Sequence, residues 1–271
     1  MRKGTLALLL GLCAAACAPP RSATITIATT TSVMGSGMLD KLGPFYRGER
    51  QVTVHAVPVG SGRALKMLEQ QQADAAITHA PAQETEMLRA HPDWSYRKVL
   101  FNRFLIVGPP DDPASAHGAA GAVGAMRRIA RADARFVSRG DESGTHERER
   151  QLWAAAEATP AQGRLVIAGA GMSETLRIAS ETRSYTLTDE NTMTRLAKQL
   201  DLRIVSEGDP LLLNTYAVLA DRANSGGSRF AEWFAASGRD HLARLISSGE
   251  LPGFFLWPQH RPSSSPSDLP F

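Results

Sequence analysis

Cysteine is almost absent from this 271-residue chain. Its two cysteines, Cys13 and Cys17, both lie within the first 17 residues. The rest of the chain therefore has no thiol with which to form a disulfide. Its fold has to be stabilised by packing alone, and an apolar fraction of 43% is that of an ordinary globular protein.

The chain is also poor in the features of nucleic-acid and metal-binding proteins. Aromatic residues make up 6%, the net charge is only +3, and the basic residues form no long run. This composition does not favour a nucleic-acid partner. The histidines lack the paired spacing of metal ligands, so neither a metal-ion site nor a cofactor is expected. They are His55, His79, His91, His117, His146, His241 and His260.

The only marked apolar run lies near the start of the chain and has the pattern of an export signal. Two basic residues at positions 2–3 precede an apolar run over residues 6–16, which is far shorter than the roughly 20 residues needed to span a bilayer. Small residues then precede Cys17, as in bacterial lipoprotein signals. We expect Cys17 to carry a lipid as the first mature residue, and the protein to lie in the periplasm or cell envelope. Plain cleavage after Ala16 or Ala18 is the alternative.

Strand and helix patterns alternate along the remaining chain. ATITIATT (23–30) and VTVHAVPV (52–59) read as strands, and each is followed by a helical stretch. FLIVGPP reads as a buried strand between two blocks of this alternation. The pattern predicts an α/β fold with two lobes, built from mostly parallel sheets with helices on both faces. NTYAVLA (214–220) would be the return strand to the first lobe.

Hydroxyl groups and glycines cluster where four predicted strands end. The turns are TTTS (29–32), GSGRA (60–64), SRGDESGT (138–145) and TLTD (186–189). Ligands of such folds collect at the carboxyl ends of strands, where helix starts supply unpaired N–H groups and about half a positive charge. Arg139 adds a planar, always-charged guanidinium. These groups together would suit a small tetrahedral oxyanion.

Each turn also has a purely structural interpretation. Serine and threonine before a helix are commonly N-caps. Asp141 could pair with Arg139 or cap the following helix, so that the arginine is used internally. Arg63 could be a surface residue or a second contact with the anion.

The same segments resemble the tungstate-binding periplasmic proteins of the TupA type, which are relatives of the molybdate- and phosphate-binding components of ABC importers. The resemblance spans nearly the whole chain after the signal, and SRGDESGTH followed by YTLTD is its most specific part. The segments are TTTS, GSGRAL, ADAAITHAP, NRFLIVGPPDDPA, SRGDESGTHERE, GAGM, YTLTD and EGDPLLLNTYAV.

The resemblance implies a type II periplasmic binding protein fold, in which two lobes close on the ligand like a hinge. We expect a signal or lipoprotein peptide at 1–17, lobe I at 18–107 and 215–258, lobe II at 108–214, and a flexible tail at 259–271. The implied ligand is tungstate, the implied partner is an ABC transporter permease, and we expect a monomer without enzymatic activity. The implied anion-binding residues are Thr30, Thr31, Ser32, Ser61, Arg139, Ser143, Thr145 and Thr188.

Three alternatives stay open. Ser143, His146 and Asp141 are the groups of a hydrolase relay, although they lie within one turn and one helix start, and no nucleophile elbow is present. An anion sensor that reports to a membrane partner needs the same loaded form as a transport protein. Within the binding class, molybdate and sulfate are also dianions, while protonated phosphate needs an acceptor that Asp141 or Glu142 could provide.

Overall fold

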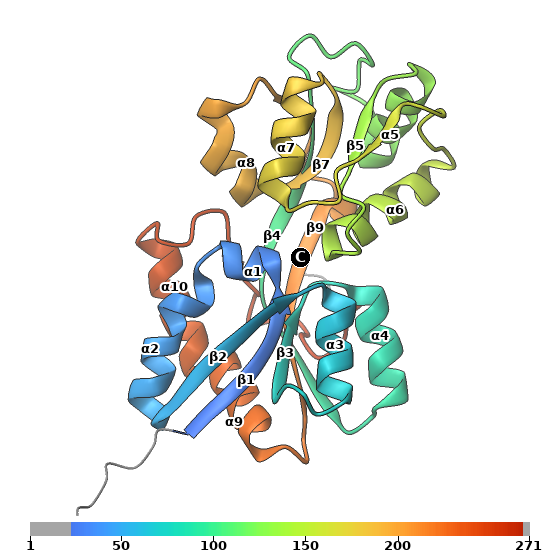
Figure 1. Cartoon of the computed structure of the whole chain (residues 1–271). Helices are drawn as coiled ribbons and strands as arrows, with labels where there is room; N and C mark the ends of the chain where they lie inside the picture. The colour runs from blue at the N-terminus through green and yellow to red at the C-terminus, as the bar shows by residue number, and fades with distance from the viewer. Residues whose placement is uncertain (1–22, 268–271) are drawn as a thin grey trace, which may run out of the picture.

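The computed structural model describes residues 23–267, so the predicted signal and Cys17 lie outside the described residues. The chain forms two lobes, one above the other in Figure 1, with two long strands running between them. The connecting strands are β4 (Trp94–Gly108) and β9 (Leu213–Asp221).

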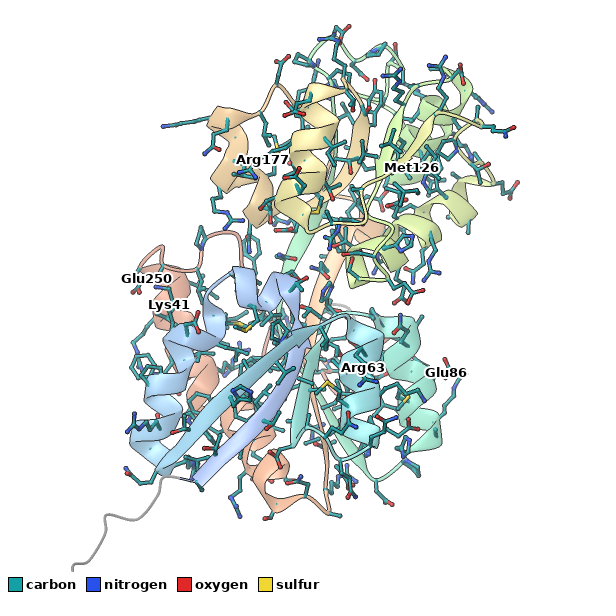
Figure 2. The ribbon with its side chains drawn as sticks, in the orientation of Figure 1. Lys41, Arg63, Glu86, Met126, Arg177 and Glu250 are labelled. Atoms are coloured by element: carbon teal, nitrogen blue, oxygen red, sulfur yellow. The ribbon has the colours of Figure 1, made fainter. Side chains whose placement is uncertain are left out.

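Lobe I combines the N-terminal and C-terminal parts of the chain (Figure 1). Its elements are β1 (Ala23–Thr30), α1 (Thr31–Gly35), α2 (Met38–Arg50), β2 (Val52–Val59), α3 (Ser61–Glu69), β3 (Ala75–Thr78), α4 (Pro81–Ala90), α9 (Ser225–Ala235), α10 (Ser237–Ser247) and β10 (Phe255–Leu256). A salt bridge of 3.0 Å between Lys41 of α2 and Glu250, just beyond α10, joins these two parts on the surface (Figure 2).

Lobe II is built from the middle of the chain. Its elements are α5 (Gly121–Arg131), β5 (Phe136–Ser138), α6 (Gly144–Ala156), β6 (Leu165–Ile167), α7 (Met172–Glu181), β7 (Tyr185–Asp189), α8 (Glu190–Leu196), a 3-10 helix (Ala197–Gln199), β8 (Arg203–Ser206) and a second 3-10 helix (Pro210–Leu212).

Both sheets are mixed. In lobe I the strand order is β2-β1-β3-β9-β4; β1 is parallel to β2 and β3, while β9 is antiparallel to both of its neighbours. In lobe II, β5 is parallel to β6 and β7, while β4 is antiparallel to β7 and β8. The predicted two-lobed α/β fold is therefore confirmed. The sheets are mixed rather than mostly parallel because the two connecting strands run against their neighbours.

Strand β4 belongs to both sheets. It pairs with β9 from Trp94 to Arg103 and with β7 from Phe104 to Val107. The change of sheet therefore falls inside this strand, whereas the sequence analysis placed the lobe boundary after residue 107. A continuous strand shared in this way lets one lobe turn relative to the other without breaking either sheet.

The strands are apolar on both sides because helices cover both faces of each sheet (Figure 1). In β1, Ile25 and Ile27 pack in the core beneath α2 and α9, and Ala28 packs in the core beneath α3 and α4. In β4, Phe104 packs with α5 and α6, and Leu105 packs with α7 and α8. This alternation decides which helices each side chain of the strand contacts.

The described part of the predicted flexible tail contacts the body of lobe I. The backbone N–H of Lys98 in β4 donates to the carbonyl of Ser263 (2.8 Å), and the Lys98 ammonium donates to the carbonyl of Pro266 (2.7 Å). Trp257 Nε1 donates to the carbonyl of Pro262 (2.9 Å). Residues 262–266 are thus held against β4 by hydrogen bonds.

No helix within residues 23–267 has both the length and the apolar character needed to cross a membrane.

The packing of α9 against lobe I makes a testable prediction at Gly227. A Cβ on Gly227 would lie 2.7 Å from the carbonyl carbon of Asp74, whereas a Cβ on the exposed Gly48 of α2 would meet nothing within 4 Å. We expect Gly227→Ala to lower the free energy of unfolding by about 1–3 kcal/mol through this overlap. Gly48→Ala should raise it by about 0.5–1 kcal/mol. Urea unfolding of both variants checks this, and equal midpoints would contradict it.

Candidate functional site

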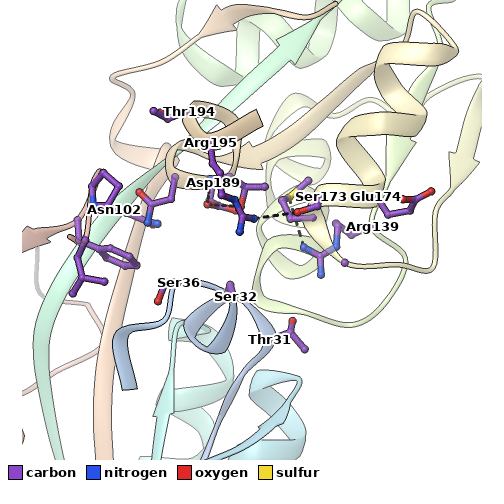
Figure 3. A pocket seen from close by; sticks show the side chains of 18 of the residues that line it. Thr31, Ser32, Ser36, Asn102, Arg139, Ser173, Glu174, Asp189, Thr194 and Arg195 are labelled. Atoms are coloured by element: carbon purple, nitrogen blue, oxygen red, sulfur yellow. Dashed lines mark hydrogen bonds between the residues drawn. The ribbon is translucent and has the colours of Figure 1, made fainter. Parts of the chain in front are cut away.

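A cleft of about 590 Å³ lies between the lobes. Lobe I contributes α1 and the loop around residues 251–254, and lobe II contributes Arg139 and the starts of α7 and α8 (Figure 3). Thr31 and Ser32 lie on the lobe I side of this cleft in Figure 3, with Arg139 across from them. The cleft thus lies at the strand ends, where α/β proteins bind their ligands.

The cleft wall of lobe II carries charges of both signs. Arg139, Arg177 and Arg195 line it, together with Glu174 and Asp189. The Asp189 carboxylate accepts hydrogen bonds from the backbone N–H of Thr192 (2.8 Å) and from its hydroxyl (2.9 Å), as the N-cap of α8. The negative charge of Asp189 is therefore partly compensated by the N–H and O–H donors at the start of α8.

Arg139 is buried, and its guanidinium is fixed from two sides. Nε donates to the carbonyl of Ala170 at 2.9 Å, and one terminal nitrogen pairs with the carboxylate of Asp141. The other terminal nitrogen contacts the sulfur of Met172 at 3.6 Å. Each terminal nitrogen carries two N–H groups, so each retains one for a ligand.

Asp141 pairs with Arg139, as considered from the sequence, while the cap of the following helix is Ser143. One carboxylate oxygen pairs with Arg139, and the other accepts from the Ser143 hydroxyl (2.7 Å) and backbone N–H (3.2 Å). Ser143 is in turn the N-cap of α6 and accepts from the backbone N–H of His146 at 3.3 Å. The arginine and the start of α6 are thus held as one unit.

The TTTS turn is arranged around a second N-cap. Thr30 Oγ1 accepts from the backbone N–H of Val33 (3.3 Å) and lies 3.0 Å from Ser32 Oγ. Ser32 Oγ is also 3.1 Å from Nε2 of His79, which directly follows β3. Thr31 is exposed and lines the cleft. The turn is therefore connected to a second strand end of lobe I.

The start of α6 lies against these lobe I turns. A Cβ on Gly144 would lie 2.5 Å from Nδ1 of His79, so the two residues are in direct contact. Nearby, Gln83 of α4 donates to the carboxylate of Glu147 in α6 at 2.9 Å. The lobes therefore meet where α6 begins.

Two polar atoms at this junction are buried without a hydrogen-bond partner among residues 23–267: Ser61 Oγ and His79 Nδ1. Ser61 is fully buried at the start of α3, and a Cβ on the preceding Gly60 would lie 3.5 Å from the carbonyl oxygen of Glu142 in lobe II. An unpaired buried polar atom costs free energy, and it usually indicates a function or an unseen partner. Both atoms therefore point to a ligand between the lobes.

The predicted anion-binding residues fall into three groups. Thr31, Ser32 and Arg139 line the cleft itself. The others, apart from Thr188, are buried in the turns that meet around it; they are Thr30, Ser61, Ser143 and Thr145. Thr188 does not join them, because it lies in β7 and its hydroxyl donates to the carbonyl of Asp189 at 3.2 Å. Arg63 is exposed on α3 (Figure 2) and does not line the cleft.

His79 was not among the predicted site residues. Its side chain is buried beside the ring of Tyr216, with ring centroids 5.1 Å apart. Burial, together with the positive charges of Arg139 and Arg148, lowers the pKa of the His79 imidazole from 6.5 to about 4. The ring is therefore neutral at physiological pH. Its position directly after a parallel strand was the one available sequence signal.

The hydrolase relay suggested by the sequence is not assembled. The Ser143 hydroxyl donates to Asp141 rather than to a histidine, and Nδ1 of His146 accepts from the backbone N–H of Glu142 at 3.1 Å. A relay needs the serine, the imidazole and the carboxylate in that order.

Two lobes joined by the connecting strands β4 and β9, with a polar cleft between them, form the architecture of a hinged solute-binding protein. The family model of the PBP superfamily domain matches residues 14–237. The chain is 35% identical over 244 residues to the tungstate-binding protein TupA of Peptoclostridium acidaminophilum, over 84% of this chain and 85% of that one.

Solved structures agree. The TupA tungstate-binding protein from Desulfovibrio alaskensis G20 matches with a TM-score of 0.73 and 31% identity, over 86% of this chain and 98% of that one. The tungstate ABC transporter structure from Geobacter sulfurreducens matches with a TM-score of 0.69 and 32% identity, over 82% and 98%. The chain therefore belongs to the PBP superfamily and, within it, to the TupA family, as the sequence resemblance predicted.

Glu149 of α6 makes the stability of the protein depend on pH. Its carboxylate accepts a hydrogen bond from the backbone N–H of Arg139 at 3.2 Å. Burial raises the pKa of the Glu149 carboxyl from 4.5 to about 7. The folded state therefore holds this proton more tightly than the unfolded chain. The contribution to stability is complete below pH 4.5 and is lost as the pH rises through 7, a change of about 3 kcal/mol.

We expect Glu149→Gln to remove this penalty, because the neutral amide can still accept from Arg139. Relative to the unmodified protein, the variant should gain stability at pH 8 and not at pH 5. Thermal unfolding at the two pH values measures the difference, and a gain that is independent of pH would contradict the assignment.

Proposed function

We propose that this protein is an extracytoplasmic solute-binding protein that captures a tetrahedral oxyanion, tungstate, between its lobes and delivers it to an ABC importer. Two of the relatives described above are named for tungstate binding, and the Geobacter structure is named as a tungstate ABC transporter. The donor groups around the cleft support the same class of ligand.

The observation that carries this proposal is the fixed guanidinium of Arg139 beside the start of α6. The ion pair with Asp141 orients the guanidinium, and one N–H on each terminal nitrogen remains for an anion. The first amides of α6 add unpaired donors and the positive end of the helix dipole. From lobe I, Ser32 and the unpaired hydroxyl of Ser61 reach the same junction.

Several donors of this kind are sufficient for tight binding. A hydrogen bond to a charged group contributes about 1.5–3 kcal/mol, and submicromolar affinity requires a little over about 8 kcal/mol. About six such bonds at the upper value total about 18 kcal/mol, which leaves about 8 kcal/mol after an association cost of about 10 kcal/mol. Because the donors come from both lobes, the anion would stabilise the closed arrangement over an open one.

The carboxylates near Arg139 are not available to accept a proton from a ligand, which favours a fully deprotonated anion. Both oxygens of Asp141 are engaged, one by Arg139 and one by Ser143, and Glu142 is exposed. Neither carboxylate is therefore well placed to accept a proton from hydrogen phosphate. A site that offers the anion mainly donors favours dianions such as tungstate, molybdate and sulfate, and the choice of tungstate among these rests on the relatives.

The cellular setting is part of the same proposal. The signal-like start of the chain supports export to the periplasm or cell envelope, and Cys17 would attach the protein to the membrane through a lipid. The protein would act as a monomer and would present its closed form to the permease.

Arg139→Ala tests the site directly. Loss of the guanidinium removes the charged donors that Asp141 and Ala170 hold in place at the cleft, so we expect tungstate affinity to fall by at least about a hundredfold. Isothermal titration calorimetry with tungstate, molybdate, sulfate and phosphate measures the affinity and the preference.

The matched control for this experiment is Arg63→Ala, which removes an exposed arginine of lobe I and should leave the affinity unchanged. Wild-type affinity in the Arg139→Ala variant would defeat the assignment of the site. Failure of the unmodified protein to bind any of the four anions would defeat the proposed function.

A further inference from the structure

His79 stands at the centre of the junction between the lobes. It follows β3 at the end that faces lobe II, and its side chain is only 4% exposed. On one side Nε2 lies 3.1 Å from Ser32 Oγ, and on the other side the ring faces Gly144, the first residue of α6. The imidazole therefore connects the TTTS turn of lobe I with the helix start of lobe II.

The second ring nitrogen is unused. Nδ1 is buried and has no hydrogen-bond partner among the described residues, although a Cβ placed on Gly144 would lie only 2.5 Å from it. Because residue 144 has no side chain, only backbone separates the ring from the first amides of α6. An oxyanion held by those amides would lie within reach of Nδ1.

The ring can adopt the tautomer that such an anion needs. In a neutral imidazole one ring nitrogen carries the N–H donor and the other carries the accepting lone pair. The hydrogen-bond partner of one nitrogen decides which of the two carries the proton. The partner of Nε2 is a hydroxyl, which can donate or accept. If Ser32 donates to Nε2, then the proton of the ring lies on Nδ1.

Burial is the main reason that the ring stays neutral. The positive charges of Arg139 and Arg148 of lobe II also lower the pKa of the imidazole, while the neutral side chain of Asn214 on β9 acts in the opposite direction, and Tyr216 adds a neutral ring. His79 therefore contributes a directed donor without a full positive charge. A lysine or arginine in its place would attract any anion, including singly protonated ones.

Building on the function proposed above, we propose that His79 is a specificity-determining residue that donates a hydrogen bond from Nδ1–H to the bound oxyanion, while Nε2 accepts from Ser32. This arrangement matches an anion whose oxygens are all acceptors, such as tungstate. It mismatches hydrogen phosphate, whose hydroxyl needs an acceptor at the same place.

Two substitutions at His79 distinguish the role of Nδ1 from that of Nε2. The amide nitrogen of asparagine can occupy the position of Nδ1, whereas the amide of glutamine reaches the position of Nε2 and leaves Nδ1 empty. We expect His79→Asn to bind tungstate within about tenfold of the unmodified protein, and His79→Gln to bind about 10- to 100-fold more weakly than His79→Asn. His55→Gln, at an exposed position on β2, is the matched control and should bind normally.

The readouts are calorimetric affinities for tungstate and for hydrogen phosphate, with thermal unfolding to confirm that each variant is folded. The ratio of the two affinities should fall in His79→Gln and be largely kept in His79→Asn, which a merely structural histidine would not cause. Equal tungstate affinities in the two variants would overturn the inference while leaving the function intact. No tungstate binding by the unmodified protein would overturn both.

A measurement on the unmodified protein does not depend on the variants folding. Nitrogen-15 NMR of the histidine rings with tungstate bound should show the His79 proton on Nδ1, with a shift of that nitrogen when tungstate is replaced by sulfate. A proton on Nε2 in the tungstate complex would overturn the inference.

Discussion

The ion pair between Arg139 and Asp141 organises the second lobe's side of the cleft. The same carboxylate that orients the guanidinium also binds Ser143, the N-cap of α6, and Glu149 from the second turn of that helix binds back to the Arg139 backbone. The loop and helix therefore form a closed circuit of hydrogen bonds. Loss of any one of these hydrogen bonds would loosen both the orientation of the Arg139 guanidinium and the position of the start of α6. This coupling explains how a loop with a glycine and two acids can present an arginine in one fixed orientation.

On both sides of the cleft the lobes meet where a glycine of one lobe faces a polar side chain of the other. On one side Gly144 of α6 faces the ring of His79, and on the other a Cβ on Gly253 of lobe I would lie 3.1 Å from the side-chain Cγ of Asn191 in α8. Separating such contacts costs little free energy, because little apolar surface becomes exposed to water when the lobes move apart. A bound anion that bridges the two halves can then decide their arrangement.

The sequence predicted the fold well where residue periodicity is decisive, as in β1, where apolar and polar residues alternate. It did not predict β6 and β10, which span three residues and two residues, too few to show a period. The direction of β9 depends on partners far away in the chain, so the mixed sheets could not be read from local patterns. In the site, Arg139 and the hydroxyl turns stood out by their chemistry. His79 did not, because a single histidine gives no signal until the fold buries it. The role of Thr188 stays a prediction; its hydroxyl donates to the carbonyl of the neighbouring Asp189, a contact that the sequence pattern does not reveal.

The position of β9 has a consequence for biosynthesis. This strand lies between β3 and β4 in the sheet of lobe I, yet it is made after the whole of lobe II. Until Leu213–Asp221 leaves the ribosome, the edges of β3 and β4 have no partner, and the sheet of the N-terminal half is incomplete. The sheet of lobe I can therefore be completed only near the end of synthesis, when most of the chain has already been made.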